Sequence, residues 1–217
     1  MVVSCWSAKG GSGTTVVAVS LALVVARRAA SGVLLVDLAG DVPAALGLAD
    51  PAGPGVVGWA EAGCDVPADA LGRLAVPVLP QVDLLPRGEG APMARERLEL
   101  LAAMLATDDR TVVVDCGTID PESPAVALAA AATTSLLVTR ACYLALRRAV
   151  AAPIRPSAAV LVSEPGRALD RSDIEAVLGV PVCAEIGVEP AVARAVDAGL
   201  LASRLPRSLQ RALRDAA

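Results

Sequence analysis

The sequence contains no histidine and no phenylalanine, and its aromatic residues are limited to Trp6, Trp59 and Tyr143. Without an imidazole, the Ser-His-Asp and Cys-His arrangements of nucleophilic catalysis are excluded. The five cysteines form no C-x-x-C pair, so a zinc site is not expected either. We interpret these cysteines as reduced thiols that pack as small hydrophobic side chains.

Charged residues are also scarce, since they make up 19% of the chain, which carries a net charge of −4. This balance argues against a general nucleic-acid binder. The apolar run 16–26 is followed by Arg27 and Arg28, where a signal peptide would have small residues before its cleavage site. No run reaches the ~18 apolar residues that span a bilayer. The sequence therefore predicts a cytoplasmic protein.

Lysine is the rarest charged residue, because 18 of the 19 basic residues are arginine and Lys9 is the exception. Lys9 lies in the glycine-rich stretch AKGGSGTT, residues 8–15. Its presence there is either a coincidence or a sign that this position needs a slim, flexible ammonium, which the planar guanidinium of arginine does not replace. We favour the second interpretation.

Short apolar runs alternate with helical patterns, and a chain that is 55% hydrophobic can bury one domain over residues 1–217. The expected strands cover residues 2–6, 33–37, 82–85, 111–115, 135–139, 159–163 and 182–186. Helices are expected over 14–30, 92–106, 124–132, 144–152, 190–198 and 206–216, with short pieces near 56–62 and 68–74, and one more helix with Ser172 as N-cap and Gly179 after its end. This alternation predicts an α/β fold, a doubly wound and mostly parallel sheet with helices on both faces.

Three features are expected at the carboxyl ends of these strands, where parallel sheets bind ligands. The glycine loop follows the first strand, Asp37 ends the second, and Asp115 ends the strand 111–115. The loop alone fits a flexible turn equally well, but together with two aspartates it predicts a nucleotide site. Backbone N–H groups at a helix N-terminus would hold phosphates, and the expected phosphate-binding residues are Gly10, Gly11, Ser12, Gly13 and Thr14.

The same positions predict a magnesium site. Thr15, in the first turn of the helix, is placed to ligate Mg²⁺, and an aspartate such as Asp115 holds the ion through water in P-loop proteins. Asp37 would polarise water or complete the outer shell of the metal.

The stretch AKGGSGTT resembles the deviant Walker A motif of the MinD/ParA class of P-loop ATPases, whose signature lysine precedes the glycines. The resemblance extends along nearly the whole chain, since VLLVDLAGD is similar to the second-strand switch, TVVVDCGT to the Walker B strand, and SDIEAVLGVPVCAEIGVEPAVARAVDAGL to the C-terminal passage. Thr14 replaces the second lysine of the motif. With this replacement the chain most resembles the branch that includes CpaE and TadZ, localisation factors of pilus-assembly systems.

The resemblance implies a homodimer that binds ATP or ADP with Mg²⁺, in which Lys9 reaches the phosphates of the partner subunit. The missing lysine at Thr14 removes a charge-assisted hydrogen bond of roughly 1.5–3 kcal/mol, so binding should survive and hydrolysis should be slow. The family pattern D-x-D is Asp37-Leu38-Ala39 here, and Asp41 is the candidate replacement for the lost catalytic carboxylate. An asparagine that reads the base is replaced within VSEP, residues 162–165, which leaves base preference open.

Such a protein would act as a spatial-positioning switch or scaffold in pilus assembly, division or partition. A nucleotide-free pseudo-NTPase that serves as an interaction module is the alternative, and a kinase-like or ligase-like enzyme lacks a second-substrate motif. The last helix carries a basic stripe beside three leucines. That stripe is either a solvated face or a weak peripheral contact with a membrane or pole, and its residues are Arg204, Arg207, Arg211 and Arg214.

Overall fold

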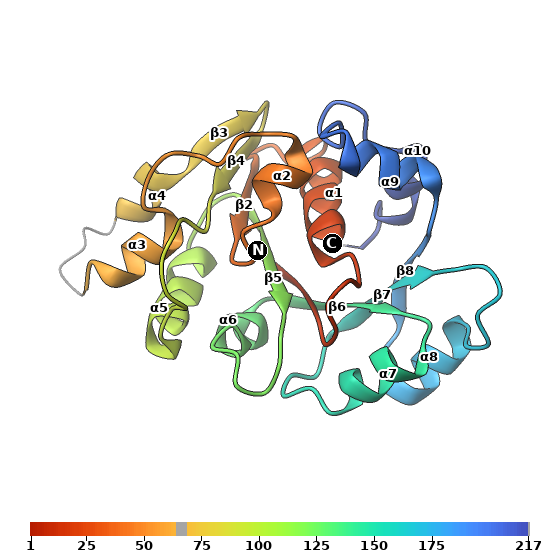
Figure 1. The fold of residues 1–217 in the computed structure, drawn as a ribbon. Helices are drawn as coiled ribbons and strands as arrows, with labels where there is room; N and C mark the ends of the chain where they lie inside the picture. Colours follow the sequence, from red (N-terminus) through yellow and green to blue (C-terminus); the bar gives the residue numbers. More distant parts are fainter. Residues whose placement is uncertain (64–68, 217) are drawn as a thin grey trace.

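The structure is a computed structural model that describes residues 1–63 and 69–216. Its centre is an eight-stranded sheet in the order β3-β4-β2-β5-β1-β6-β7-β8 (Figure 1). All neighbouring strands are parallel except β3 and β4, which are antiparallel. The strands are β1 (Val2–Ser7), β2 (Val33–Asp37), β3 (Val76–Leu79), β4 (Val82–Leu85), β5 (Thr111–Thr118), β6 (Thr134–Arg140), β7 (Ala158–Ser163) and β8 (Val182–Gly187).

Helices cover both faces of the sheet (Figure 1). One face packs against α1, α2, α9 and α10, and the opposite face against α3 to α8. The bounds are α1 (Thr14–Ala26), α2 (Val42–Leu46), α3 (Gly55–Glu61), α4 (Ala70–Leu74), α5 (Arg95–Ala106), α6 (Val126–Ala131), α7 (Tyr143–Val150), α8 (Arg171–Leu178), α9 (Pro190–Asp197) and α10 (Arg207–Ala212). The predicted fold class is therefore confirmed.

Two elements were not predicted. Strand β3 contains Pro77, which lowers strand propensity but is tolerated because β3 is the edge strand of the sheet. Helix α2 is a single short turn of five residues, too short for a periodic signal. The predicted helical piece 68–74 begins at a position outside the described residues, and the structure shows α4 over Ala70–Leu74.

Several predicted bounds were wrong at the helix ends. Helix α1 ends at Ala26 rather than residue 30, α5 begins at Arg95 rather than Pro92, and α10 ends at Ala212 rather than residue 216. For α8, Ser172 was the wrong N-cap. The cap is Asp170, whose carboxylate accepts from the Asp173 amide while the Asp173 carboxylate accepts from the Asp170 amide.

The register of the central strands places the two predicted aspartates side by side. Asp37 pairs with Asp115 across β2 and β5, and Cys5 pairs with Asp115 across β1 and β5. Asp37 ends β2 as predicted, but β5 continues beyond Asp115 to Thr118. Asp115 therefore lies within its strand, three residues before the carboxyl end, and both of its strand neighbours are buried.

The structure shows where the three leucines beside the predicted basic stripe lie. Leu205, Leu209 and Leu213 are buried in the core beside α1. Of the four arginines, Arg207 and Arg211 lie in α10, the other two flank it, and all four are exposed. The arginines therefore lie on the exposed side of a helix whose leucines pack on the core. None of the helices in the described residues is both long and apolar enough to cross a bilayer.

Two glycines hold α2 against the segment after α9. Gly47, the C-cap of α2, has φ +74°, and a Cβ there would lie 2.0 Å from the Gly199 carbonyl oxygen. Gly199 also has positive φ, and the two backbones touch because neither has a side chain. This contact ties the C-terminal part of the chain to the helix that follows Asp41.

Replacing Gly47 with alanine should therefore destabilise the protein more than an ordinary glycine replacement. Gly166 is a matched control, because it has φ +78° and open space at its Cβ. Gly166→Ala should lower the free energy of unfolding by about 1–2 kcal/mol through left-handed strain alone, and Gly47→Ala by about 3 kcal/mol or more. Urea denaturation of both variants measures this, and equal losses would contradict the backbone contact.

Candidate nucleotide site

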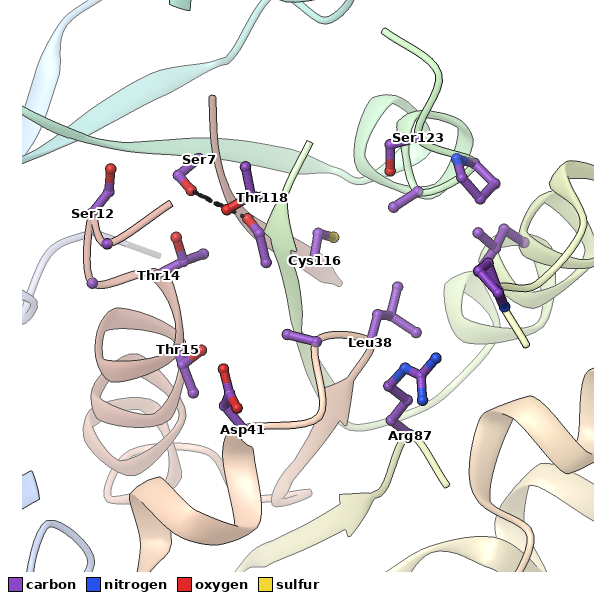
Figure 2. Close-up of a pocket in the computed structure, with 18 of the residues that line it drawn as sticks. Ser7, Ser12, Thr14, Thr15, Leu38, Asp41, Arg87, Cys116, Thr118 and Ser123 are labelled. Atoms are coloured by element: carbon purple, nitrogen blue, oxygen red, sulfur yellow. Dashed lines mark hydrogen bonds between the residues drawn. The ribbon is translucent and has the colours of Figure 1, made fainter. Parts of the chain in front are cut away.

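A cavity of about 590 Å³ opens at the carboxyl ends of β1, β2 and β5 (Figure 2). The glycine loop and the start of α1 form one wall, and the loops after β2, β4 and β5 form the rest. Its lining residues are Ser7, Gly11, Ser12, Gly13, Thr14, Thr15, Val16, Leu38, Ala39, Asp41, Arg87, Pro92, Met93, Leu98, Cys116, Gly117, Thr118, Ser123, Pro124 and Ala125. The predicted loop thus lies at the edge of the sheet where parallel folds bind ligands.

The glycine loop has a backbone that only glycine adopts easily. Gly11 and Gly13 have φ of +74° and +91°, and Gly13 is the N-cap of α1 without a side-chain cap. The Ser12 hydroxyl donates to the Lys9 carbonyl oxygen at 2.7 Å, which closes the loop. The first turn of α1 contains no acidic residue. Its N-terminal amides and the positive end of its dipole therefore suit an anion.

Asp115 lies beneath this loop with its side chain fully buried. One carboxylate oxygen, Oδ1, accepts from the Gly117 amide at 3.0 Å, whereas Oδ2 is buried without a hydrogen-bond partner. The pKa of Asp115 is raised to about 6. Burial is the largest cause and the charges of Asp37 and Asp41 add to it, whereas the neighbouring Thr15 hydroxyl and the Gly117 amide lower the pKa. An orphaned carboxylate oxygen beside a threonine hydroxyl fits a hydrated Mg²⁺.

Asp37 is buried as well, but its carboxylate is engaged with its own loop. Oδ1 accepts from the amides of Ala39 and Gly40 at 3.0 and 2.6 Å, and Oδ2 from the Val42 amide at 3.2 Å. Burial raises the pKa of Asp37, although these three amides lower it. Asp37 therefore shapes the loop that carries Asp41 and begins α2.

The other predicted residues separate into two groups. Thr14 is buried, and with Thr15 and Asp41 it lines the cavity. Lys9, Gly10, Asp37 and Asp115 are not among the lining residues. The Lys9 ammonium donates to the carbonyl oxygen of Gly10, its own neighbour, at 3.3 Å. The structure thus brings Gly11 to Thr15 together with Asp41 around the cavity, and Asp115 lies buried beside Thr15.

Sequence reasoning missed Arg87. This residue follows β4 in Pro86-Arg87-Gly88, and its side chain lines the cavity opposite the glycine loop (Figure 2). The nearest sequence signal was the Pro-Arg-Gly that follows the strand end, which by itself is typical of any turn.

The position predicted to read the base carries a different group. Glu164, after β7, accepts from Arg140 at 2.6 Å and also pairs with Arg167. It lines a second cavity of about 750 Å³ at the ends of β7 and β8. The region VSEP, where we expected a base-reading asparagine to be replaced, therefore contains a carboxylate between two guanidinium groups.

The burial of the Asp115 carboxylate predicts how the stability of the protein without Mg²⁺ depends on pH. The folded-state pKa of Asp115 is raised, so its protonated form adds to the free energy of unfolding. This contribution is fully present below about pH 4 and is lost as pH rises through about 6. Asp115→Asn removes this ionisation. Between pH 5 and pH 7.5 in EDTA, the unfolding free energy of the variant should rise by about 1 kcal/mol relative to wild type. Urea denaturation at both pH values measures it, and a constant difference would contradict the burial of this charge.

Comparison with solved structures finds the same fold in P-loop ATPases. A ParA family ATPase from Chlorobium tepidum has a TM-score of 0.77 at 20% identity, with 99% of this chain and 97% of that chain covered. The septum site-determining protein MinD from Pyrococcus horikoshii, complexed with Mg-ADP, has a TM-score of 0.77 at 19% identity, with coverage of 99% and 93%. The MinC:MinD complex of Aquifex aeolicus gives 0.74 at 17%, with coverage of 98% and 93%.

No curated protein matches the chain. A family model described as "Cellulose biosynthesis protein BcsQ" matches residues 1–117, which contain the glycine loop, both buried aspartates and Arg87. The expected MinD/ParA-type P-loop fold is thereby confirmed, and the chain belongs to the BcsQ family of cellulose biosynthesis proteins.

Proposed function

We propose that the protein binds ATP or ADP with Mg²⁺ in the cavity, dimerises around the nucleotide and acts as a spatial-positioning switch or scaffold. The observation that carries this proposal is the glycine loop at the start of α1, where the Thr15 hydroxyl neighbours the buried Asp115 carboxylate, whose Oδ2 has no hydrogen-bond partner. An anion site and a cation-seeking carboxylate at one sheet edge suit a nucleotide with its metal. The MinD of the same fold that was solved with Mg-ADP supports it.

Thr15 and Asp115 would hold the magnesium ion, Thr15 through its hydroxyl and Asp115 through water. When bound, Mg²⁺ neutralises part of the phosphate charge, which three nearby carboxylates would otherwise repel. Gly10 to Thr14 would bind the phosphates through backbone N–H groups and hydroxyls. Asp37 would keep the loop after β2 in place, as its three backbone hydrogen bonds indicate.

Lys9 would act on the partner subunit. In its own subunit its ammonium makes an exposed hydrogen bond with the Gly10 carbonyl oxygen and does not line the cavity. A lysine that serves the facing phosphates would make nucleotide the link between the two subunits, which is how the signature lysine acts in the MinD/ParA class.

Hydrolysis would be slow. Thr14 supplies a hydroxyl where that class usually has a second lysine, and Ala39 occupies the position of the second aspartate. Asp41 lines the cavity and is the remaining candidate for orienting water. A site with these substitutions is better suited to a long-lived dimer than to rapid turnover.

The machine that such a dimer would position is suggested by the family. Its description points to cellulose biosynthesis, and Thr14 is the feature that the chain shares with the CpaE and TadZ factors of pilus assembly. The solved MinC:MinD complex supports a protein partner. The four exposed arginines around α10 could add a weak peripheral contact with an anionic membrane, without help from the buried leucines.

A nucleotide-free interaction module is the second candidate. The buried Thr14 and the Glu164 pairs favour it, because both replace groups that bind nucleotide in the wider class. Such a module would have no use for an unpaired carboxylate at Asp115 or for a lone lysine in the loop.

The role of Lys9 is tested by Lys9→Ala. With AMPPNP and Mg²⁺, the variant should dimerise about ten- to hundredfold more weakly than wild type, because a charge-assisted hydrogen bond across the interface is lost. Analytical ultracentrifugation with and without nucleotide measures it. Arg73→Ala is the control, since Arg73 is an exposed cation paired with Asp69. Unchanged nucleotide-dependent dimerisation of Lys9→Ala would overturn the role in trans.

A lysine at position 14 should restore the missing contact within the subunit. Thr14→Lys is expected to raise ATP affinity about tenfold or more, or to raise turnover, because an ammonium binds phosphate oxygens more strongly than a hydroxyl does. Isothermal titration calorimetry and phosphate release measure the two effects, with Thr14→Ala as the control. No gain in either quantity would show that the cavity is not built around phosphates at this position.

A further inference from the structure

Arg87 is the one basic residue among those that line the cavity in the described part of the chain. We propose that Arg87 binds the terminal phosphate of the nucleotide and supplies, from the loop after β4, a positive charge that Thr14 does not provide. This inference rests on the proposed function, because it names a residue of the same site.

The partners of the other half-buried arginines set Arg87 apart. Arg110 pairs with Asp83 and Asp108, Arg140 pairs with Glu164, and Arg97 lies 4.3 Å over the ring of Trp59. Arg87 lines the cavity and makes no ion pair within residues 1–63 and 69–216. A partly buried cation without a counter-charge suits an anionic ligand.

Arg87 also lines a neighbouring cavity together with acidic residues but forms no ion pair with them. This neighbouring cavity has a volume of about 570 Å³ and contains Asp37, Asp50 and Glu89. The Arg87 guanidinium instead donates to the carbonyl oxygens of Gly88 and Gly90, at 3.0 and 3.4 Å. A guanidinium has five N–H groups, so the side chain keeps donors for a ligand.

The backbone beneath Arg87 is fixed. A Cβ at Gly88 would lie 2.1 Å from the Pro54 carbonyl oxygen, and one at Gly55 would lie 2.6 Å from the Arg87 carbonyl carbon. The Arg87 carbonyl oxygen also accepts from the Val57 amide. The Arg87 stem passes Gly40, where an added Cβ would lie 3.5 Å from its Cδ. Arg87 therefore lies in a closely packed turn beside the loop after β2.

Sheet order indicates which phosphate it would meet. The strands run β4-β2-β5-β1, each about 4.8 Å from the next. The glycine loop follows β1, and Asp115 lies on β5, between that loop and Arg87 in the order of the strands. A magnesium ion held at Asp115 would favour a terminal phosphate on the β5 side of the loop, towards β2 and β4. Arg87 lies across the cavity from Thr14 and Thr15 (Figure 2).

The test compares AMPPNP with ADP, each with Mg²⁺, by isothermal titration calorimetry on the full chain. Arg87→Ala should weaken AMPPNP binding about ten- to hundredfold and change ADP binding less than about threefold. Arg87→Lys should recover part of the loss, because it keeps the charge without the fork. Arg95→Ala is the control, since Arg95 is exposed and pairs with Glu99.

The outcomes separate the two proposals. Equal loss of both nucleotides in Arg87→Ala, or no change in AMPPNP binding, would overturn the assignment to the terminal phosphate and leave the nucleotide site intact. A wild-type chain that binds neither nucleotide would overturn the proposed function, and the role of Arg87 with it. Selective loss of AMPPNP in Arg87→Ala, with Arg95→Ala unchanged, supports both.

Discussion

The site depends on the parallel pairing of β2 with β5, which places Asp37 opposite Asp115. Two carboxylates meet there in the interior of the sheet, and burial opposes their ionisation. Asp37 is compensated by three backbone amides of the following loop. Asp115 has one amide and an unpaired oxygen. The difference divides their tasks, because one holds the loop and the other is left for a ligand.

A shortage of positive charge is the second constraint on this edge of the sheet. Asp37 and Asp41 are close enough to act on the charge of Asp115, Thr14 provides no charge, and Lys9 does not line the cavity. Helix α1 offers its N-terminal dipole, which is worth far less than a full charge. Arg87 in the loop after β4 and a metal at Asp115 would supply the balance within one subunit, and Lys9 of the partner subunit would add to it. Nucleotide binding and dimerisation would thus be linked through charge.

The sequence was sufficient for the strands other than β3 and for the loop, since apolar strands and a glycine loop are local signals. It did not reveal Arg87, because only the sheet order brings β4 beside β2. The contact between Gly47 and Gly199 could not be predicted either, because the two glycines are far apart in the sequence. The hydrogen bonds that the Asp37 carboxylate accepts were also not predicted, since they depend on the backbone conformation of residues 39–42. Asp170 was passed over as N-cap because Ser172 nearby has equal capping preference.

Equilibrium dialysis of the wild-type chain against ATP, with Mg²⁺ and with EDTA, tests the central claim most directly. We expect saturable binding of one ATP per chain, strengthened by Mg²⁺, because the loop and the unpaired Asp115 oxygen form one anion and metal site. Absence of binding at millimolar ATP with Mg²⁺ would contradict this account and leave the nucleotide-free interaction module as the better description.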